Sequence, residues 1–236
     1  MSVSNNNRVR MIKDFISLFF PRVCLTCGDP LIKGLDELCV KCLIELPKTN
    51  NYLVSIPEFE MKFSGIIVLR HVLVYLFFQK RGIVQRLLHE LKYNNKRELG
   101  IKLGAWYGKE LAIGSFIDEF DLILPIPLHK TKLRSRGYNQ SEAFSEGLAK
   151  SLSAPVNVTS LIRIEASETQ TNKSRIERWK NVEGIFVVVK KEEIAGKRVL
   201  LVDDVLTTGS TLIAAATPLL EAGAASVSVA LLAAAK

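Results

Sequence analysis

The fold of this chain is decided by the run Val199-Leu200-Leu201-Val202-Asp203-Asp204-Val205-Leu206-Thr207-Thr208-Gly209-Ser210-Thr211. Its leading apolar residues predict a strand that is buried on both faces. Two carboxylates follow, then small hydroxyl residues around a glycine, and residues 211–221 have the apolar spacing of a helix. No lysine follows the glycine, which excludes the lysine-containing phosphate loop of nucleoside-triphosphate binding.

The junction between this strand and this helix has the chemistry of an anion site. A helix N-terminus offers unpaired N–H groups, and Gly209 lets the backbone approach a phosphate closely. Asp203 and Asp204 would repel that phosphate unless sugar hydroxyls or a divalent cation partnered them. A phosphorylated ribose meets both needs, because it carries a 5-phosphate and vicinal hydroxyls. The alternative is structural: the acids and hydroxyls would only cap the helix.

The rest of the chain alternates strand and helix patterns. Further strands are predicted at 66–78, 120–125, 156–164, 185–189 and 227–232, and helices at 82–93, 97–111 and from 137 onwards. The helix at 211–221 should be broken or bent at Pro218. This alternation predicts an α/β fold whose mostly parallel sheet carries helices on both faces. We divide the chain into residues 1–50 (helix and cysteine module), a hood-like α/β connecting region at 51–115 and a core at 116–236.

All four cysteines lie in two C-x-x-C pairs, Cys24 with Cys27 and Cys39 with Cys42. Each pair places two thiolates on one tight turn, and two such turns can close a tetrahedral sulfur shell around Zn2+. A complete shell leaves no position for substrate, so we predict a structural zinc ion that holds residues 20–46 together. A redox pair or disulfide and an iron–sulfur cluster are the alternatives.

A cluster of basic residues follows the predicted strand at 120–125. In an open parallel sheet, ligands bind at the carboxyl ends of the strands, where such a segment lies. A pyrophosphate bound there would need cations. We therefore predict a pyrophosphate-binding loop, against the alternative of a solvated basic turn, formed by Lys130, Lys132, Arg134 and Arg136.

Three motifs together resemble one family. They are the four-cysteine module, the run P-I-P-L-x-x-x-K-x-R-x-R-G-Y-N-Q from Pro125, and the run V-D-D-V-x-T-T-G-S-T from Val202. Their order and spacing over about residues 20–234 resemble the ComF (competence protein F) family, which includes the gluconate-utilisation protein GntX. The resemblance implies a zinc ribbon joined to a type I phosphoribosyltransferase-like domain. Many members of the family are linked to DNA uptake in natural transformation.

The resemblance also implies a site for phosphoribosyl pyrophosphate (PRPP). Asp203 and Asp204 would hold the ribose hydroxyls with the help of Mg2+. Related enzymes close a loop over PRPP, and Lys173 and Arg175 of the polar stretch 165–183 would be its catalytic candidates unless that stretch is only a basic surface loop. Lys92-Tyr93-Asn94 would belong to a hood over the substrate or form an exposed helix end. The 5-phosphate would lie on Thr207, Thr208, Gly209, Ser210 and Thr211.

The charge balance leaves three functions open. A formal net charge of +8 and a pI of about 9.3 favour anionic partners such as phosphorylated metabolites or nucleic acid. The chain could be a Mg2+-dependent phosphoribosyltransferase, a PRPP sensor without catalysis, or a competence factor that engages single-stranded DNA and DNA-uptake proteins. No feature of the sequence indicates the acceptor of a transfer or the oligomeric state.

The hydropathy pattern predicts no membrane span. No stretch of about 18 uncharged apolar residues is present, and the apolar residues 15–20 are too few for a signal peptide. We predict an amphipathic helix that ends at Pro21, and a cytoplasmic location.

Overall fold

A computed structural model describes residues 22–164 and 185–235. The predicted N-terminal helix and the polar stretch 165–183 therefore lie outside the described residues. The described helices are α2 Val40–Ile44, α3 Pro57–Glu60, α4 Ile83–Tyr93, α5 Arg97–Ile113, α6 Lys130–Arg136, α7 Gln140–Leu152 and α9 Ser210–Glu221, with the 3-10 turn η1 Lys191–Glu193. The strands are β1 Val72–Phe78, β2 Leu122–Pro125, β3 Leu161–Arg163, β4 Phe186–Val188, β5 Arg198–Leu206 and β6 Ser226–Ala235.

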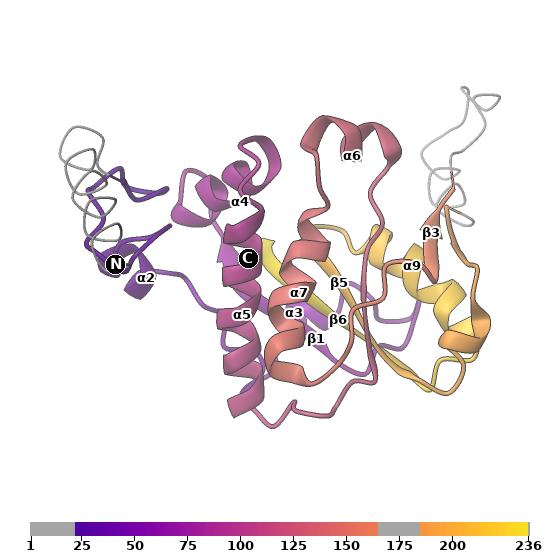
Figure 1. The fold of residues 1–236 in the computed structure, drawn as a ribbon. Coiled ribbons are helices and arrows are strands. Elements are labelled where there is room, and N and C mark those ends of the chain that lie inside the picture. The colour runs from indigo at the N-terminus through magenta and orange to yellow at the C-terminus, as the bar shows by residue number, and fades with distance from the viewer. Residues whose placement is uncertain (1–21, 165–184, 236) are drawn as a thin grey trace, which may run out of the picture.

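A four-stranded sheet of order β1-β6-β5-β2 forms the centre of the molecule, and every pair of neighbours is parallel. The two central strands, β5 and β6, are the long ones. Strands β3 and β4 form a separate antiparallel pair beside α9 (Figure 1). Because β1 pairs with β6, part of the segment 51–115 belongs to the same sheet as the C-terminal core.

Helices cover both faces of the sheet, as the apolar pattern predicts. Alternate residues of β5 point to opposite sides: Leu200 and Val202 join a core with α4, α5 and α7, whereas Val199 and Leu201 join a core with α3 and α9. All four side chains are buried. The predicted α/β fold with a parallel sheet between two layers of helices is confirmed. Within the described residues, no helix is long and apolar enough to cross a membrane.

Helices α5 and α7 lie side by side and approach each other at glycines (Figure 1). A Cβ atom on Gly104 would lie 2.1 Å from the carbonyl oxygen of Phe144, and one on Gly147 would lie 2.2 Å from that of Ile101. Real Cβ atoms never come so close, so the backbones touch only because both positions lack a side chain. This packing places the N-terminal end of α7 against the sheet.

Several boundaries differ from the predicted ones. The strand predicted at 66–78 begins only at Val72, because Ile66 and Ile67 still belong to a turn in which both backbone N–H groups donate to the carbonyl of Phe63. In the stretch predicted as a strand at 156–164, Val156 makes only an isolated bridge to β2, and pairing resumes at β3. Helix α9 is not broken at Pro218 but continues through it.

Two differences bear on the site. Strand β5 does not stop at Val202 but continues through both acids to Leu206, because Asp203, Val205 and Leu206 still pair with β6. The basic segment that we predicted as a loop is the helix α6. Its N-cap is His129, whose Nδ1 accepts from the backbone N–H of Thr131, and the left-handed Gly137 ends it.

Candidate functional site

The acid pair lies at the carboxyl end of the central strand β5, on partly exposed positions. Ser141, at the start of α7, donates from Oγ to Oδ1 of Asp203 over 3.1 Å, and the backbone N–H of Asp204 donates to the same oxygen over 2.9 Å. Burial, followed by the nearby charge of Asp204, raises the pKa of Asp203 to about 7. The pair therefore holds a proton more readily than two exposed aspartates would.

Asp204 has a different partner. Lys92, in the last turn of α4, places Nζ 2.7 Å from Oδ2 of Asp204, and about a fifth of each side chain is exposed. The sequence indicated Lys92 only as part of a possible hood, and it did not indicate Ser141. A signal for Ser141 was present, since it directly follows the R-G-Y-N-Q motif that ends at Gln140.

The loop after β5 has the form expected of an anion cradle. Gly209 has a φ of 82° and is the N-cap of α9, and a Cβ there would lie 3.0 Å from the buried ring of Phe63. Thr207 and Thr208 are exposed. Lys62 donates from Nζ to the carbonyl oxygen of Thr207 over 2.8 Å. Hydroxyl groups and the N–H groups of α9 thus lie around one backbone turn, close to the ammonium group of Lys62.

The capping alternative fails for the acids. The N-cap of α9 is Gly209, and the side chain that bonds to this helix end is that of Thr208, whose Oγ1 accepts from the backbone N–H of Ser210 over 3.4 Å. Asp203 and Asp204 lie inside β5 and bond instead to α7 and α4. Their carboxylates therefore do not cap the N-terminus of the following helix.

Helix α6 lies beyond the carboxyl end of β2, which neighbours β5 (Figure 1). Lys130 and Arg134 are four residues apart and share one side of this seven-residue helix, and Lys132 and Arg136 share the other. Arg136 donates from Nη1 to Oε1 of Gln140 over 2.8 Å. On a regular helix the four basic residues thus divide into two pairs, and their role in binding pyrophosphate stays a prediction.

The segment after α6 ties three elements together at this edge. Tyr138 donates its hydroxyl hydrogen to the carbonyl of Leu91 over 2.5 Å, and Gln140 Nε2 donates to the same carbonyl over 3.4 Å. Asn139 Nδ2 donates to the carbonyl of Ile126 over 2.9 Å. All three donor side chains are buried. They hold the end of α4, and with it Lys92, in place beside β5.

The acid pair retains oxygens that fit a divalent cation. Among the residues that the structure describes, Oδ2 of Asp203 and Oδ1 of Asp204 accept no hydrogen bond. Mg2+ prefers such carboxylate oxygens and keeps several waters, which a partly exposed position allows. The donor set therefore fits Mg2+. Lys173 and Arg175 lie outside the described residues.

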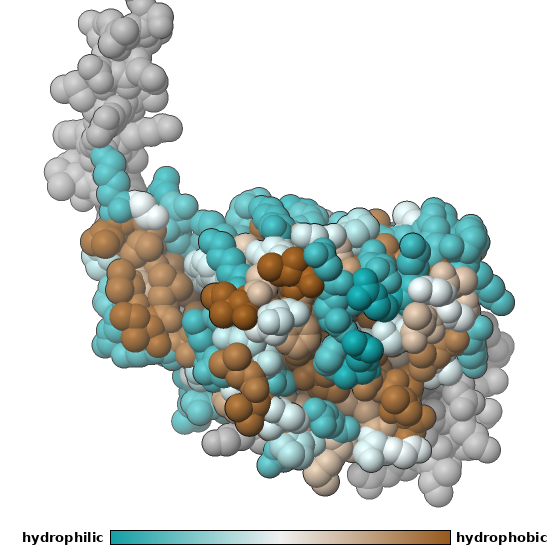
Figure 2. Space-filling model, turned by 90° about the horizontal axis from the view of Figure 1, so that it is seen from below, coloured by the Kyte–Doolittle hydropathy of each residue, from teal (hydrophilic) through white to brown (hydrophobic). Residues whose placement is uncertain are grey.

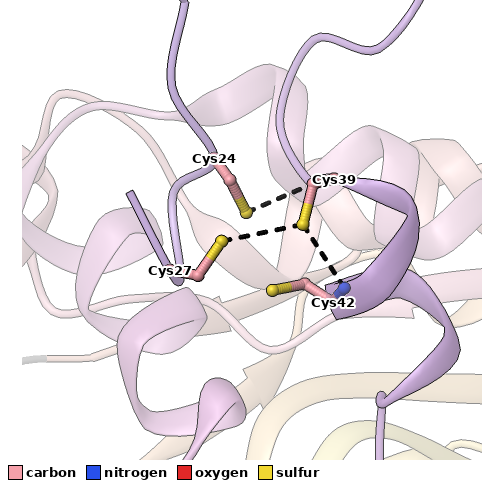
Figure 3. A group of neighbouring side chains, drawn as sticks. All are labelled: Cys24, Cys27, Cys39 and Cys42. Carbon is pink, nitrogen blue, oxygen red and sulfur yellow. Dashed lines mark hydrogen bonds between the residues drawn. The ribbon is translucent and has the colours of Figure 1, made fainter. Parts of the chain in front are cut away.

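The four cysteines gather into one cluster, as Figure 3 shows. Their Sγ atoms all lie within 4.8 Å of one another, and those of Cys27 and Cys39 are 3.6 Å apart. A tetrahedral zinc ion with Zn–S bonds of about 2.3 Å requires S···S distances of about 3.8 Å. The backbone N–H of Cys39 also donates to Cys24 Sγ over 3.3 Å. The cluster is compatible with the predicted structural zinc ion.

The cysteine module packs on the rest of the molecule but keeps much apolar surface outside. Cys24 and Cys42 join the core that α4 and α5 share, and Arg86 of α4 donates to the carbonyl of Thr26. Lys102 of α5 pairs with Asp36 over 3.1 Å. Figure 2 shows hydrophobic surface on this module. Its exposed apolar side chains include Val23, Ile32, Val40 and Ile44. The module is thus held in place partly by its contacts with α4 and α5.

The comparisons with known proteins agree with this fold. Residues 139–236 match the family described as the phosphoribosyl transferase domain. Competence protein F of Haemophilus influenzae is 37% identical over 191 residues, which cover 80% of this chain and 74% of that protein. The DNA utilization protein YhgH of Salmonella typhi is 31% identical over 224 residues, 93% of this chain and 85% of that protein.

Among solved structures, the allosteric regulatory enzyme of purine biosynthesis covers 61% of this chain and 29% of its own, with 25% identity and a TM-score of 0.42. This likeness is too low to support an inference by itself. The parallel sheet, the domain match and the cysteine cluster define a type I phosphoribosyltransferase-like protein with an N-terminal four-cysteine module. Within that class, the chain belongs to the competence protein F family.

Proposed function

We propose that the chain binds PRPP and transfers its phosphoribosyl group to a nitrogen acceptor. The observation that carries this proposal is the placement of both acids and the hydroxyl-rich turn at one strand end. Strand β5 presents Asp203 and Asp204, and the loop that follows leads directly into the N-terminus of α9. A phosphorylated ribose has the two kinds of group that this arrangement can bind, a phosphate and vicinal hydroxyls.

Each part of the site has its own task in this proposal. The turn at Gly209, with its hydroxyl groups and the N–H groups of α9, takes the 5-phosphate. Asp203 and Asp204 take the ribose hydroxyls and hold Mg2+, whose positive charge would stabilise the leaving pyrophosphate. One side of α6, together with Lys173 and Arg175, supplies further cations for the pyrophosphate. No covalent nucleophile is required, because the protein's contribution is positioning and charge.

The names of the relatives suggest the setting of this activity. One relative is named a competence protein and another a DNA utilization protein. We propose that the chain supports DNA uptake or use, with PRPP as its ligand. In a transformable host, replacement of the chromosomal copy by the Asp204→Asn variant should then lower transformation frequency while protein abundance stays unchanged. An unchanged frequency would separate the PRPP site from DNA uptake.

Calorimetric titration of PRPP with Mg2+ tests the site itself. Asp204→Asn combined with Thr208→Ala should weaken binding at least about 100-fold. The first change removes a carboxylate that would bind Mg2+ and the ribose hydroxyls, and the second removes a hydroxyl that would donate to the charged 5-phosphate. Thr217→Ala is a matched control, since Thr217 lies further along α9 and donates to the carbonyl of Ile213. Unchanged affinity in the double variant would show that PRPP does not bind here.

A pyrophosphate-release assay against a panel of bases and amines then separates an enzyme from a sensor. Release that depends on one acceptor class would establish the transfer and identify its substrate. PRPP binding without release in any combination, including added single-stranded DNA, would favour a non-catalytic PRPP sensor.

A further inference from the structure

Lys92 is the only basic residue, among those that the structure describes, that pairs with the acid pair. It comes from α4, more than a hundred residues before β5 in the chain. Its position is held from both sides: Leu91 is buried in the core, and the Leu91 carbonyl accepts from Tyr138 and Gln140. The backbone that carries the Lys92 ammonium group is thus fixed at the end of α4, next to Asp204.

This placement creates a competition for Asp204. A divalent cation at the acid pair would need the carboxylate that Lys92 already contacts over 2.7 Å. Lys92 and a divalent cation bound to the same carboxylate would also repel each other, because little solvent surrounds these largely buried groups. Lys92 therefore opposes the entry of a metal ion into the empty site.

We propose that Lys92 is an exchangeable counter-ion, which neutralises Asp204 in the empty site and transfers to the pyrophosphate when PRPP and its cation occupy the acid pair. This inference rests on the proposed PRPP site and adds a role for a residue of α4.

The chemistry of PRPP places the new partner of Lys92 within reach. The 1-pyrophosphate and the 2-hydroxyl are carried by neighbouring ribose carbons. An ammonium group that touches the carboxylate which binds the hydroxyls is therefore a few ångströms from the pyrophosphate. A lysine side chain covers such a distance by rotation about its own bonds, and its backbone can stay where Tyr138 and Gln140 hold it.

The exchange predicts opposite effects of one substitution on two ligands. Without PRPP, Lys92→Met should tighten the binding of Mn2+, a probe for the cation site, about fivefold, because a half-buried ion pair competes by roughly that factor. With PRPP and Mg2+, the same variant should lose a charged hydrogen bond to phosphate, worth about tenfold or more in affinity. After the fivefold gain at Asp204 is subtracted from this loss, PRPP should bind at least about twofold more weakly.

Electron paramagnetic resonance of Mn2+ with the ligand-free protein, and calorimetry of PRPP with Mg2+, measure the two effects. Lys92→Arg keeps the charge and should stay near wild type for Mn2+. Lys96→Met is the control for net charge, since Lys96 is exposed just beyond α4, and it should change neither affinity. Circular dichroism and melting temperature establish that Lys92→Met folds.

Each outcome decides one question. Tighter Mn2+ binding with weaker PRPP binding in Lys92→Met supports the exchange, since a merely structural defect would weaken both. Weaker or unchanged Mn2+ binding, or PRPP affinity that is unchanged or increased, overturns it while wild-type PRPP binding still stands. If the wild-type protein binds no PRPP, the proposed function fails first, and the Mn2+ comparison alone then reports whether Lys92 competes for Asp204.

Discussion

Asp203 has a raised pKa, which makes the stability of the protein depend on pH. It lies next to a second carboxylate and is largely surrounded by protein, so burial and then Asp204 raise its pKa to about 7. In the unfolded chain an aspartate titrates near about 3.9. Because the folded pKa lies above the unfolded one, the favourable contribution of this group to stability is complete below about pH 4 and is lost as the pH rises through about 7.

Asp203→Asn should therefore stabilise the ligand-free protein increasingly as the pH rises. The difference in melting temperature from wild type should grow between pH 4 and pH 8 by at least about 3 °C, which corresponds to roughly 1 kcal/mol. Asp121→Asn is a control of opposite sign. Hydrogen bonds and charge from Arg198 lower the pKa of Asp121 to about 2, so its removal should destabilise the protein at neutral pH. Calorimetry at several pH values checks both, and a pH-independent effect of Asp203→Asn would contradict the assignment.

Gly209 combines two requirements, a left-handed backbone and contact with a ring. Gly209→Ala should lower the free energy of unfolding by more than Gly196→Ala. Both glycines have positive φ, but a Cβ at Gly196 meets nothing within 4 Å, whereas one at Gly209 lies 3.0 Å from Phe63. The left-handed conformation alone costs about 1–2 kcal/mol, and Gly209→Ala should add the displacement of Phe63 to that cost. Urea unfolding measures the difference, and equal losses would show that Phe63 moves freely.

At the scale of elements, the site depends on how α4, α6 and α7 meet the sheet. The R-G-Y-N-Q motif ends α6, anchors α4 through the Leu91 carbonyl and begins α7, where Ser141 reaches Asp203. Helix α7 can reach β5 because it packs against α5 without side chains at the crossing. The position of Ser141, which donates to Asp203, thus depends on how α7 packs against α5.

The crossing gives a prediction in which two effects have opposite signs. Replacing a helical glycine by alanine favours the helix by about 1 kcal/mol. At Gly147, however, the new Cβ would lie 2.2 Å from the carbonyl of Ile101, and overpacking of this kind costs about 1–3 kcal/mol or more. Because the contact is so close, the cost should lie at the upper end of that range, and Gly147→Ala should destabilise the protein by about 2 kcal/mol. Gly100→Ala, whose nearest contact would be the Ala143 methyl group at 3.0 Å, should cost less. Denaturant unfolding compares them, and a stabilised Gly147→Ala would show that the helices can separate without loss.

At the scale of the molecule, the cysteine module and the acid pair of the proposed PRPP site lie at separate places. The module packs through Cys24 and Cys42 on the core under α4 and α5, whereas the acid pair lies at the carboxyl edge of the sheet. Among the described residues, the hydrogen bonds of the cysteine sulfurs stay within the module and do not reach Asp203 or Asp204. A zinc ion in the module should therefore support folding without taking part in binding.

Metal analysis of the purified protein should find one zinc ion per chain. Cys39→Ser, or prolonged chelation, should lower the melting temperature and increase hydrogen exchange in residues 22–46, while β5 and α9 stay protected and PRPP affinity is kept. Lys41→Ala, at an exposed position of the same short helix, should change none of these. Absence of zinc together with an unaffected Cys39→Ser variant would remove the metal from the description.

Features whose residues are neighbours in the chain could be predicted from the amino-acid pattern. The apolar strand, the acid pair and the glycine turn are consecutive, and the two C-x-x-C pairs have local ligand spacing, so pattern and chemistry were sufficient to predict a parallel α/β fold and a four-cysteine cluster. Folding was needed to bring Lys92 and Ser141 to the acids, to place Phe63 against Gly209, and to form a helix from the basic segment. These features depend on contacts between residues that are distant in the chain. Such contacts follow from helix packing and burial, and no local periodicity records them.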